Sequence, residues 1–495
     1  MGLFLRLMNF FNKSQDISFQ SREEKSEVET DPIIVPKVNN YNSTVEKAVV
    51  KMYAPKSMKI VNLVINIGID FGTSFTKVCF SEGRTSQFID FDGIWYKDSI
   101  VYYNYKENTF LFSKPESLDN IEEIKYFKYS MIDDKLPKGK RLQELNITIK
   151  PEILCSIFFL ACIIKESKEK ISRYYKKQSI NFSIEWNITL GVPIDNYENE
   201  KQKNSLYDRI IHIANILSEQ LSTYTISIDP LYKLYKMKEN MEIPKFGTSF
   251  INTLPELYAE SFAFLKDDNL SALNGVYAII DIGGATVDMA IISKEGNEDF
   301  SVISKTIIPV GIEIVSNSVI SDRRYADQIK AELKTRNNLN VFPYVVVDKE
   351  ESLKEQLRSS FAAMVMDLKV KNREILENMS NGVLKIIICG GGANHKWYED
   401  GIRRNEQLLR PTLPKGLKLS IEPVELLIKG TEIKNLSHRQ IISYILSKPV
   451  GEYLTELKGY PWHFEDIKPT TPNYNDHDRY MDMQDIQKER YGEPV

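Results

Sequence analysis

Two short segments of the chain have residue types and spacing that suit phosphate chemistry. They cover residues 67–80 and 278–292, and each has an apolar strand ending in Asp, a turn of Gly and Thr, and a second apolar strand. Glycine lets backbone N–H groups approach phosphoryl oxygens closely, Thr hydroxyls add donors, and a neighbouring carboxylate can hold hydrated Mg²⁺. Two similar units in one chain suggest two related half-domains that face each other. We therefore predict a nucleotide bound between two lobes.

The two segments supply separate candidate ligands for metal and phosphate. Asp70 and Asp281 are expected to hold Mg²⁺ through its waters, and Asp288 to orient those waters. The candidate phosphate donors lie in the turns after the strands: Gly72, Thr73, Ser74, Gly283, Gly284 and Thr286. If the ligands come from both lobes, ATP and ADP should favour different lobe angles. Such an enzyme would act as a switch as much as a catalyst.

Strands alternating with helices must position these motifs, and this alternation predicts an α/β fold. Apolar residues at helical spacing predict helices over 151–176, 200–218, 325–336 and 352–372. A buried strand is predicted at 384–389, and it runs into a third glycine turn formed by Gly390, Gly391 and Gly392.

The rest of the chain divides into segments of different composition. We predict an amphipathic helix over 1–13, a flexible linker over 14–60, a first lobe over 61–270, a second lobe over 271–459 and an extended or disordered tail over 460–495. The N-terminal helix suits an interfacial membrane helix or a partner-docking helix, and a helix folded back on its own domain is the alternative. Within the first lobe, residues 224–250 read as a loop-rich insertion.

The composition excludes several other classes of protein. The net charge of −4 gives no sign of a nucleic-acid-binding surface. The four cysteines lack CxxC spacing and lie in apolar surroundings, which predicts buried free thiols in a reducing compartment such as the cytoplasm. The five histidines are scattered, so no zinc site is expected. No apolar run is long enough to span a bilayer, which leaves peripheral membrane contact through residues 1–13.

The order of the three glycine motifs resembles that of the actin-like nucleotidases, a superfamily that includes actin, the 70-kDa heat-shock chaperones and sugar kinases. Asp70-Phe-Gly-Thr-Ser74 is similar to the first phosphate motif, and Asp281-Ile-Gly-Gly-Ala-Thr-Val-Asp288 to the second. The turn after residues 384–389 is similar to the adenosine motif. The resemblance covers about residues 62–450. It implies a duplicated ribonuclease-H-like, two-lobed fold that binds ATP or ADP with Mg²⁺.

Finer matches favour the heat-shock chaperone branch. The segment that begins Glu256-Leu-Tyr-Ala resembles a helix of that branch, although Pro precedes the Glu here instead of following it. The resemblance makes Glu256 the residue that positions the attacking water, and a solvated helix carboxylate is the alternative. Phe127-Lys-Tyr129 looks like the segment that carries the γ-phosphate lysine, which would be Lys128; one surface lysine among many is the alternative.

A helix of the second lobe adds two candidate nucleotide ligands. Residues 326–330 resemble the helix that touches the ribose and adenine, which makes Asp327 and Lys330 candidates. The family usually has Glu where Asp327 stands, and a plain amphipathic helix is the alternative.

The expected function is a slowly hydrolysing ATPase whose nucleotide state regulates a protein partner. About a hundred residues follow Gly392, which leaves no room for the peptide-binding domain of the chaperones. Contact with the partner is expected through residues 1–13, 224–250 or 460–495. A membrane-tethered, filament-forming actin relative is the second hypothesis, and a small-molecule kinase is the third.

Overall fold

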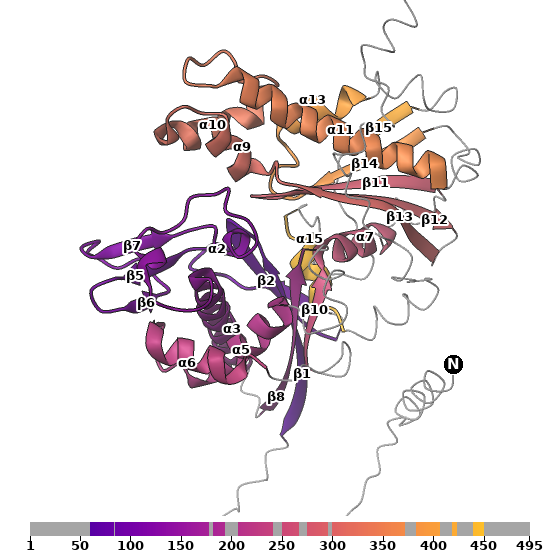
Figure 1. The fold of residues 1–495 in the computed structure, drawn as a ribbon. Helices are drawn as coiled ribbons and strands as arrows, with labels where there is room; N and C mark the ends of the chain where they lie inside the picture. Colours follow the sequence, from indigo (N-terminus) through magenta and orange to yellow (C-terminus); the bar gives the residue numbers. More distant parts are fainter. Residues whose placement is uncertain are drawn as a thin grey trace, which may run out of the picture. The chain divides into compact units, whose positions relative to one another are not determined.

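A computed structural model describes most of the chain between residues 60 and 449 (Figure 1). The described ranges are 60–83, 85–177, 182–193, 206–240, 250–266, 275–295, 299–371, 383–405, 418–422 and 439–449. The predicted N-terminal helix, linker and C-terminal tail (1–13, 14–60 and 460–495) lie outside these ranges, apart from Ile60.

The first large sheet contains the first phosphate-type segment. Its path runs through β10 (Ile251–Pro255), β8 (Phe182–Val192), β1 (Val61–Phe71), β2 (Phe75–Glu82) and β3 (Thr85–Phe88), and β4 (Tyr96–Asp98) also pairs with β2. Strands β1 and β2 form an antiparallel hairpin, and β3 is antiparallel to β2. Strands β1, β8 and β10 run parallel to one another.

The second sheet contains the second phosphate-type segment and repeats the topology of the first. Its order is β13 (Asp299–Ile308), β12 (Val287–Glu295), β11 (Gly275–Ile282), β14 (Val383–Cys389) and β15 (Lys418–Glu422). Here too the first two strands form an antiparallel hairpin, the third extends it, and the last two run parallel to the first. The two similar units seen in the sequence therefore begin two sheets of the same strand order and direction, and the α/β class is confirmed.

Helices pack on each large sheet, and an apolar core lies between the sheet and its helices. The first sheet packs with α3 (Pro151–Lys177), α5 (Leu206–Gln220) and α6 (Ile228–Lys238) in one apolar cluster. The second packs with α9 (Ile312–Ser318), α10 (Ala326–Thr335), α11 (Val347–Lys371) and α13 (Lys396–Arg403). These positions confirm the helices predicted over 151–176, 325–336 and 352–372, and α5 confirms the described part of the helix predicted over 200–218.

A smaller antiparallel sheet corrects one sequence-based prediction. It contains β7 (Ile121–Ile124), β5 (Val101–Asn104), β6 (Thr109–Leu111) and β9 (Thr225–Ser227). Strand β9 and the helix α6 occupy residues 225–238, so the prediction of a loop-rich insertion over 224–250 is wrong for this part; residues 241–249 lie outside the described ranges. The physical reason is a buried stripe at helical spacing, Ile228, Leu231 and Tyr235.

Two helices lie between the large sheets and join them (Figure 1). Helices α7 (Glu256–Lys266) and α15 (Ile441–Leu446) share an apolar cluster with residues of both sheets. A Cβ added to Gly68 of β1 would lie 2.3 Å from the carbonyl oxygen of Ser443, so α15 rests directly on the backbone of β1. Residues 441–446 fall within the predicted second lobe, yet they also pack directly on β1, β2 and β8 of the first sheet.

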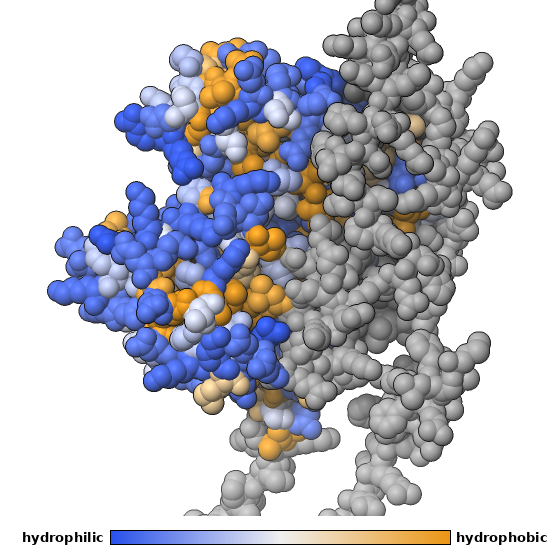
Figure 2. All heavy atoms as spheres, viewed as in Figure 1, coloured by the Kyte–Doolittle hydropathy of each residue, from blue (hydrophilic) through white to orange (hydrophobic). Residues whose placement is uncertain are grey.

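On the face drawn in Figure 2, hydrophilic residues predominate and apolar areas are interspersed among them. Among the described helices, none combines the length and apolar composition that a bilayer crossing requires.

Candidate functional site

The two hairpins place acidic residues at equivalent points of the two sheets. Asp70 in β1 lies opposite Lys77 in β2, whose Nζ donates to Asp70 Oδ2 at 2.7 Å. Asp281 in β11 lies opposite Asp288 in β12, at the matching position of the second hairpin. Both Asp70 and Asp281 are buried. One hairpin therefore neutralises its strand-end carboxylate with a lysine, whereas the other places two carboxylates side by side.

The turns that follow the two strand ends approach each other closely. A Cβ added to Gly284 would lie 2.8 Å from Ser74 Oγ and 3.3 Å from Thr73 Cβ. The turn after β1 therefore touches the turn after β11, although the two turns are far apart in the sequence. This proximity brings together the predicted phosphate donors of both segments.

Two of the predicted backbone donors already make hydrogen bonds within their own turns. The N–H of Gly283 donates to the carbonyl oxygen of Thr286 at 2.9 Å, and that of Gly72 donates to the carbonyl oxygen of Asp70 at 3.2 Å. Each N–H thus bonds a nearby carbonyl oxygen in this arrangement, and the predicted contact of Gly72 and Gly283 with phosphate stays a prediction. A residue larger than glycine is excluded at position 72, where a Cβ would lie 2.3 Å from the carbonyl oxygen of Phe75.

A buried ion pair joins the two residues predicted to serve the γ-phosphate. Lys128 lies in the short helix α2 (Phe127–Ser130), and its Nζ donates to Oε1 of Glu256, the first residue of α7, at 2.8 Å. Their side chains are only 7% and 11% exposed. Gly191, near the end of β8, leaves room for the pair, because a Cβ there would lie 3.0 Å from Glu256 Cγ. The alternatives of a solvated carboxylate and a surface lysine are therefore wrong.

The acidic residues of both sheets act on one another electrostatically. Burial raises the pKa of Asp281 well above its ordinary value, and the charges of Asp288, Glu256 and Asp70 raise it further, while Lys77 lowers it. Burial also raises the pKa of Glu256; Lys128 opposes this change, and Asp70 adds to it. The predicted metal-binding carboxylates thus belong to a single cluster that extends across the two sheets.

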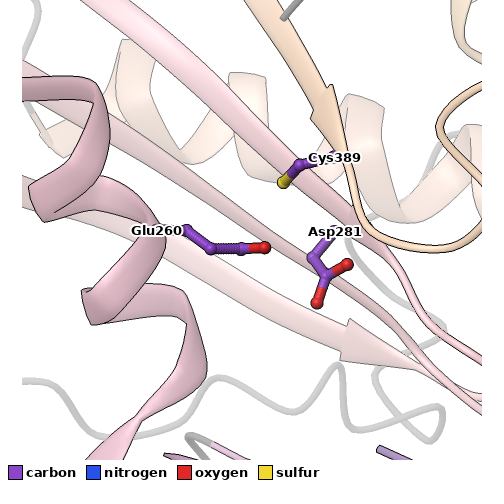
Figure 3. A group of neighbouring side chains, drawn as sticks. All are labelled: Glu260, Asp281 and Cys389. Carbon is purple, nitrogen blue, oxygen red and sulfur yellow. The ribbon is translucent and has the colours of Figure 1, made fainter. Parts of the chain in front are cut away.

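A further carboxylate, which the sequence analysis does not include, faces Asp281 from α7. Glu260 is fully buried, and its carboxylate, Asp281 and Cys389 each offer one atom within 4.8 Å of the others (Figure 3). Neither oxygen of Glu260 has a hydrogen-bond partner among the described residues, and the same holds for Asp281 Oδ1. Burial raises the pKa of Glu260 well above its ordinary value, and the charge of Asp281 adds to the change. This side of the cluster holds more acidic groups than nearby cations balance, which favours the protonated forms of Glu260 and Asp281.

The third glycine turn packs onto the strand end that carries Asp281. Gly390 has a left-handed backbone with φ 79°, and a Cβ there would lie 1.8 Å from Asp281 Oδ1, so only glycine fits. The N–H of Gly392 donates to the carbonyl oxygen of Ile282 at 2.9 Å, and Arg439 Nη2 donates to that of Gly391 at 3.1 Å. The turn therefore holds Asp281 in place. Its predicted contact with adenosine stays a prediction.

The two candidates on α10 connect to the turns through a residue that sequence reasoning missed. Asp327 is 93% exposed and pairs with Lys330 at 3.2 Å between Oδ1 and Nζ. Lys330 Nζ also pairs with Oε2 of Glu313 at 2.6 Å. Glu313, in the first turn of α9, accepts hydrogen bonds from Ser74 Oγ at 3.1 Å and from Tyr126 Oη at 2.9 Å. Its sequence signal is modest: an acidic residue two positions after a glycine, at the start of a short helix.

Neither a scan against protein-family models nor a search of curated proteins finds a match to this chain.

Proposed function

We propose that the chain binds ATP with Mg²⁺ at the junction of the two sheets and hydrolyses it slowly, as an actin-like, two-lobed nucleotidase would. One observation carries this proposal: Asp70 and Asp281 lie at matching strand ends of two sheets with the same topology, and their charges act on each other. A ligand bound by both sheets would need a cation to meet the carboxylates and anionic groups to meet the backbone of the glycine turns. A metal-bound nucleotide has both properties.

The donor set of the cluster fits Mg²⁺. The ion prefers oxygen ligands and keeps several of its waters, and Asp70, Asp281 and Asp288 supply carboxylate oxygens. Asp281 Oδ1 is a buried oxygen without a hydrogen-bond partner among the described residues, so it would gain from a nearby hydrated cation. When bound there, the ion would neutralise charge on the phosphate chain.

The ion pair of Lys128 and Glu256 supports separate roles for the two residues during hydrolysis, Lys128 at the γ-phosphate and Glu256 at the attacking water. The γ-phosphate carries more negative charge than a carboxylate, so it would attract the ammonium group of Lys128 away from Glu256. Glu256 would then be left to accept a hydrogen bond from a water molecule and to orient it. The water oxygen attacks the γ-phosphorus as the bond to the bridging oxygen breaks, which yields ADP, phosphate and a proton.

The proximity of the turns supports a regulatory role. Because a Cβ on Gly284 would already crowd Ser74, a phosphate chain between the turns would have to separate them. The nucleotide would thereby change the angle between the sheets, and a cytoplasmic protein partner would sense that angle.

Isothermal titration calorimetry with ATP and Mg²⁺ tests the proposal. We expect binding in the wild type that is at least about tenfold weaker in Asp281→Ala and when EDTA removes the metal, because a lost charge-assisted contact costs about 1.5–3 kcal/mol. Asp119→Ala, an exposed aspartate before β7, is the matched control and should bind as the wild type does. Phosphate release without an added acceptor would separate an ATPase from a small-molecule kinase. Absence of binding by any purine nucleotide would reject the proposal.

A further inference from the structure

Glu313 makes polar contacts with both the first and the second glycine turn. Its side chain is buried, and its oxygens accept hydrogen bonds from Ser74 of the first turn and from Tyr126 just before α2. Its own N–H donates to the carbonyl oxygen of Gly284 in the second turn at 2.6 Å. With its ion pair to Lys330, this one residue connects the first turn, the start of α2 and α10 through its carboxylate, and the second turn through its backbone.

The groups around this carboxylate are typical of an anion-binding site. Two hydroxyl donors, Ser74 Oγ and Tyr126 Oη, and one ammonium group, Lys330 Nζ, converge on it. Burial acts to lower the pKa of Lys330, but the hydrogen bonds and charges of Glu313 and Asp327 together outweigh it, so the pKa of the ammonium group is raised. Burial and Glu313 both raise the pKa of Tyr126, which keeps the phenol protonated and able to donate. Hydroxyl and ammonium donors of this kind also bind phosphoryl oxygens.

The backbone of Tyr126 shows that the arrangement is held under constraint. The residue has φ 59° and ψ 15°, a left-handed conformation that residues with a side chain rarely adopt. Its phenol is fixed by Glu313, and the helix that carries Lys128 begins at the next residue. Release of the phenol would therefore free the start of α2 at the point where it approaches Glu256.

We propose that Ser74, Tyr126 and Lys330 form an anion subsite for a phosphoryl group, and that Glu313 occupies it until a polyphosphate displaces the carboxylate. This inference rests on the proposed nucleotide binding and adds two elements to it: Tyr126 as a ligand and Glu313 as an internal competitor. Two of the donors, Ser74 and Lys330, are also residues for which the sequence predicts nucleotide contact. An arriving phosphate and the carboxylate of Glu313 repel each other, so the two cannot occupy the subsite together.

Displacement of Glu313 would couple binding to movement. Glu313 links the two turns, and the departure of its carboxylate removes that link at the moment when the phosphate chain enters. It also releases Tyr126, and with it the residues that lead to Lys128. The same donors thus hold the turns together in the free protein and bind the ligand afterwards.

Inorganic tripolyphosphate tests the subsite without the nucleoside. In calorimetry, Glu313→Ala and the isosteric Glu313→Gln should each bind tripolyphosphate about tenfold more tightly than the wild type, a change of about 1.4 kcal/mol. Adding Tyr126→Phe to Glu313→Gln should reverse most of that gain, because the phenol is then lost as a ligand. Glu332→Ala, the same charge change on α10, is the control and should alter the affinity by less than twofold.

The outcomes separate this inference from the proposed function. Equal or weaker binding of tripolyphosphate by both Glu313 variants, with thermal unfolding unchanged, would overturn the inference, and so would a gain that does not depend on Tyr126. Tighter tripolyphosphate binding without any binding of ATP would retain the anion subsite and reject the nucleotidase. Tighter binding of both ligands would support both proposals.

Discussion

Lys128 and Glu256, which lie 128 positions apart in the chain, form a buried ion pair with 2.8 Å between Nζ and Oε1. Removing one partner of such a pair leaves an uncompensated charge, which costs about 3–5 kcal/mol of unfolding free energy. We therefore expect Lys128→Met and Glu256→Gln each to destabilise the protein by about that amount. The double variant should lose at least about 1 kcal/mol less than the sum of the two single changes.

Urea unfolding of the four proteins in this double-mutant cycle measures the coupling. The control is the surface pair of Lys236, in α6, and Glu239, just after it, with 2.9 Å between Nζ and Oε2. This pair should show no measurable coupling. Strictly additive effects of the Lys128 and Glu256 changes would mean that the ion pair is not formed in solution.

Glu256→Gln should also separate hydrolysis from binding. The amide keeps the shape of the side chain but is a poorer acceptor for a water proton, so the loss falls on the transition state. We expect single-turnover hydrolysis of ATP to slow by at least about a hundredfold, while the affinity for ATP changes by less than about twofold. An unchanged rate in a variant that still binds ATP would limit Glu256 to its structural role beside Lys128.

Glu260 should make the stability of the protein depend on pH. Its pKa in the folded protein lies well above the ordinary value of 4.5, chiefly because of burial. The folded state therefore holds a proton that the unfolded state releases, and stability is lost as the pH rises above 4.5 toward the folded-state pKa. Relative to Glu260→Gln, the wild type should lose up to about 1.4 kcal/mol per pH unit across that interval.

Urea unfolding of wild type and Glu260→Gln between pH 4 and pH 8 would measure this difference. The two proteins should be similar in stability near pH 4, and the variant should be the more stable one at pH 8. Glu351→Gln, an exposed change on α11, should follow the wild type throughout. If the wild-type and Glu260→Gln curves run parallel, Glu260 is not a buried titrating group.

The four cysteines should be unreactive in the folded protein. All of them are buried free thiols, and burial raises the pKa of Cys79 to about 12, while the hydroxyl of Ser447 only partly opposes the change. The thiolate is the reactive species, so its fraction at pH 8 is negligible. Ellman's reagent should detect no thiol in native protein at pH 8 and all four in denaturant. Rapid labelling of native protein would show that the core opens readily.

Local sequence patterns are sufficient to locate the acidic residues at the strand ends. They do not show which residues from distant parts of the chain contact one another. An apolar run followed by Asp and glycine is a signal within a dozen residues, so Asp70 and Asp281 were found directly. Lys128 and Glu256 entered only through a resemblance, since no spacing rule relates residues from α2 and α7. Which residues meet across two sheets depends on how the layers pack.

Two missed residues illustrate different limits. Glu313 takes its hydrogen bonds from residues 239 and 187 positions away, and no local pattern encodes contacts of that range. Glu260 was within reach, because it stands one helical turn after Glu256 in an otherwise apolar helix, and a carboxylate at such a position must be buried with its neighbours. For residues 225–238 the sequence predicts a loop-rich insertion, because Lys and Tyr residues obscure the apolar positions that recur at helical spacing.

The contact of α15 with Gly68 has a consequence for synthesis on the ribosome. Ser81 Oγ, on the strand next to Gly68, bonds the carbonyl oxygen of Ser447, which is 366 positions further along the chain. At about 5–20 residues per second, roughly 20 to 70 s of translation separate the two. During that interval the backbone of β1 at Gly68 lacks its contact with α15. The sheet whose strands are made first thus receives its last covering helix only near the end of synthesis.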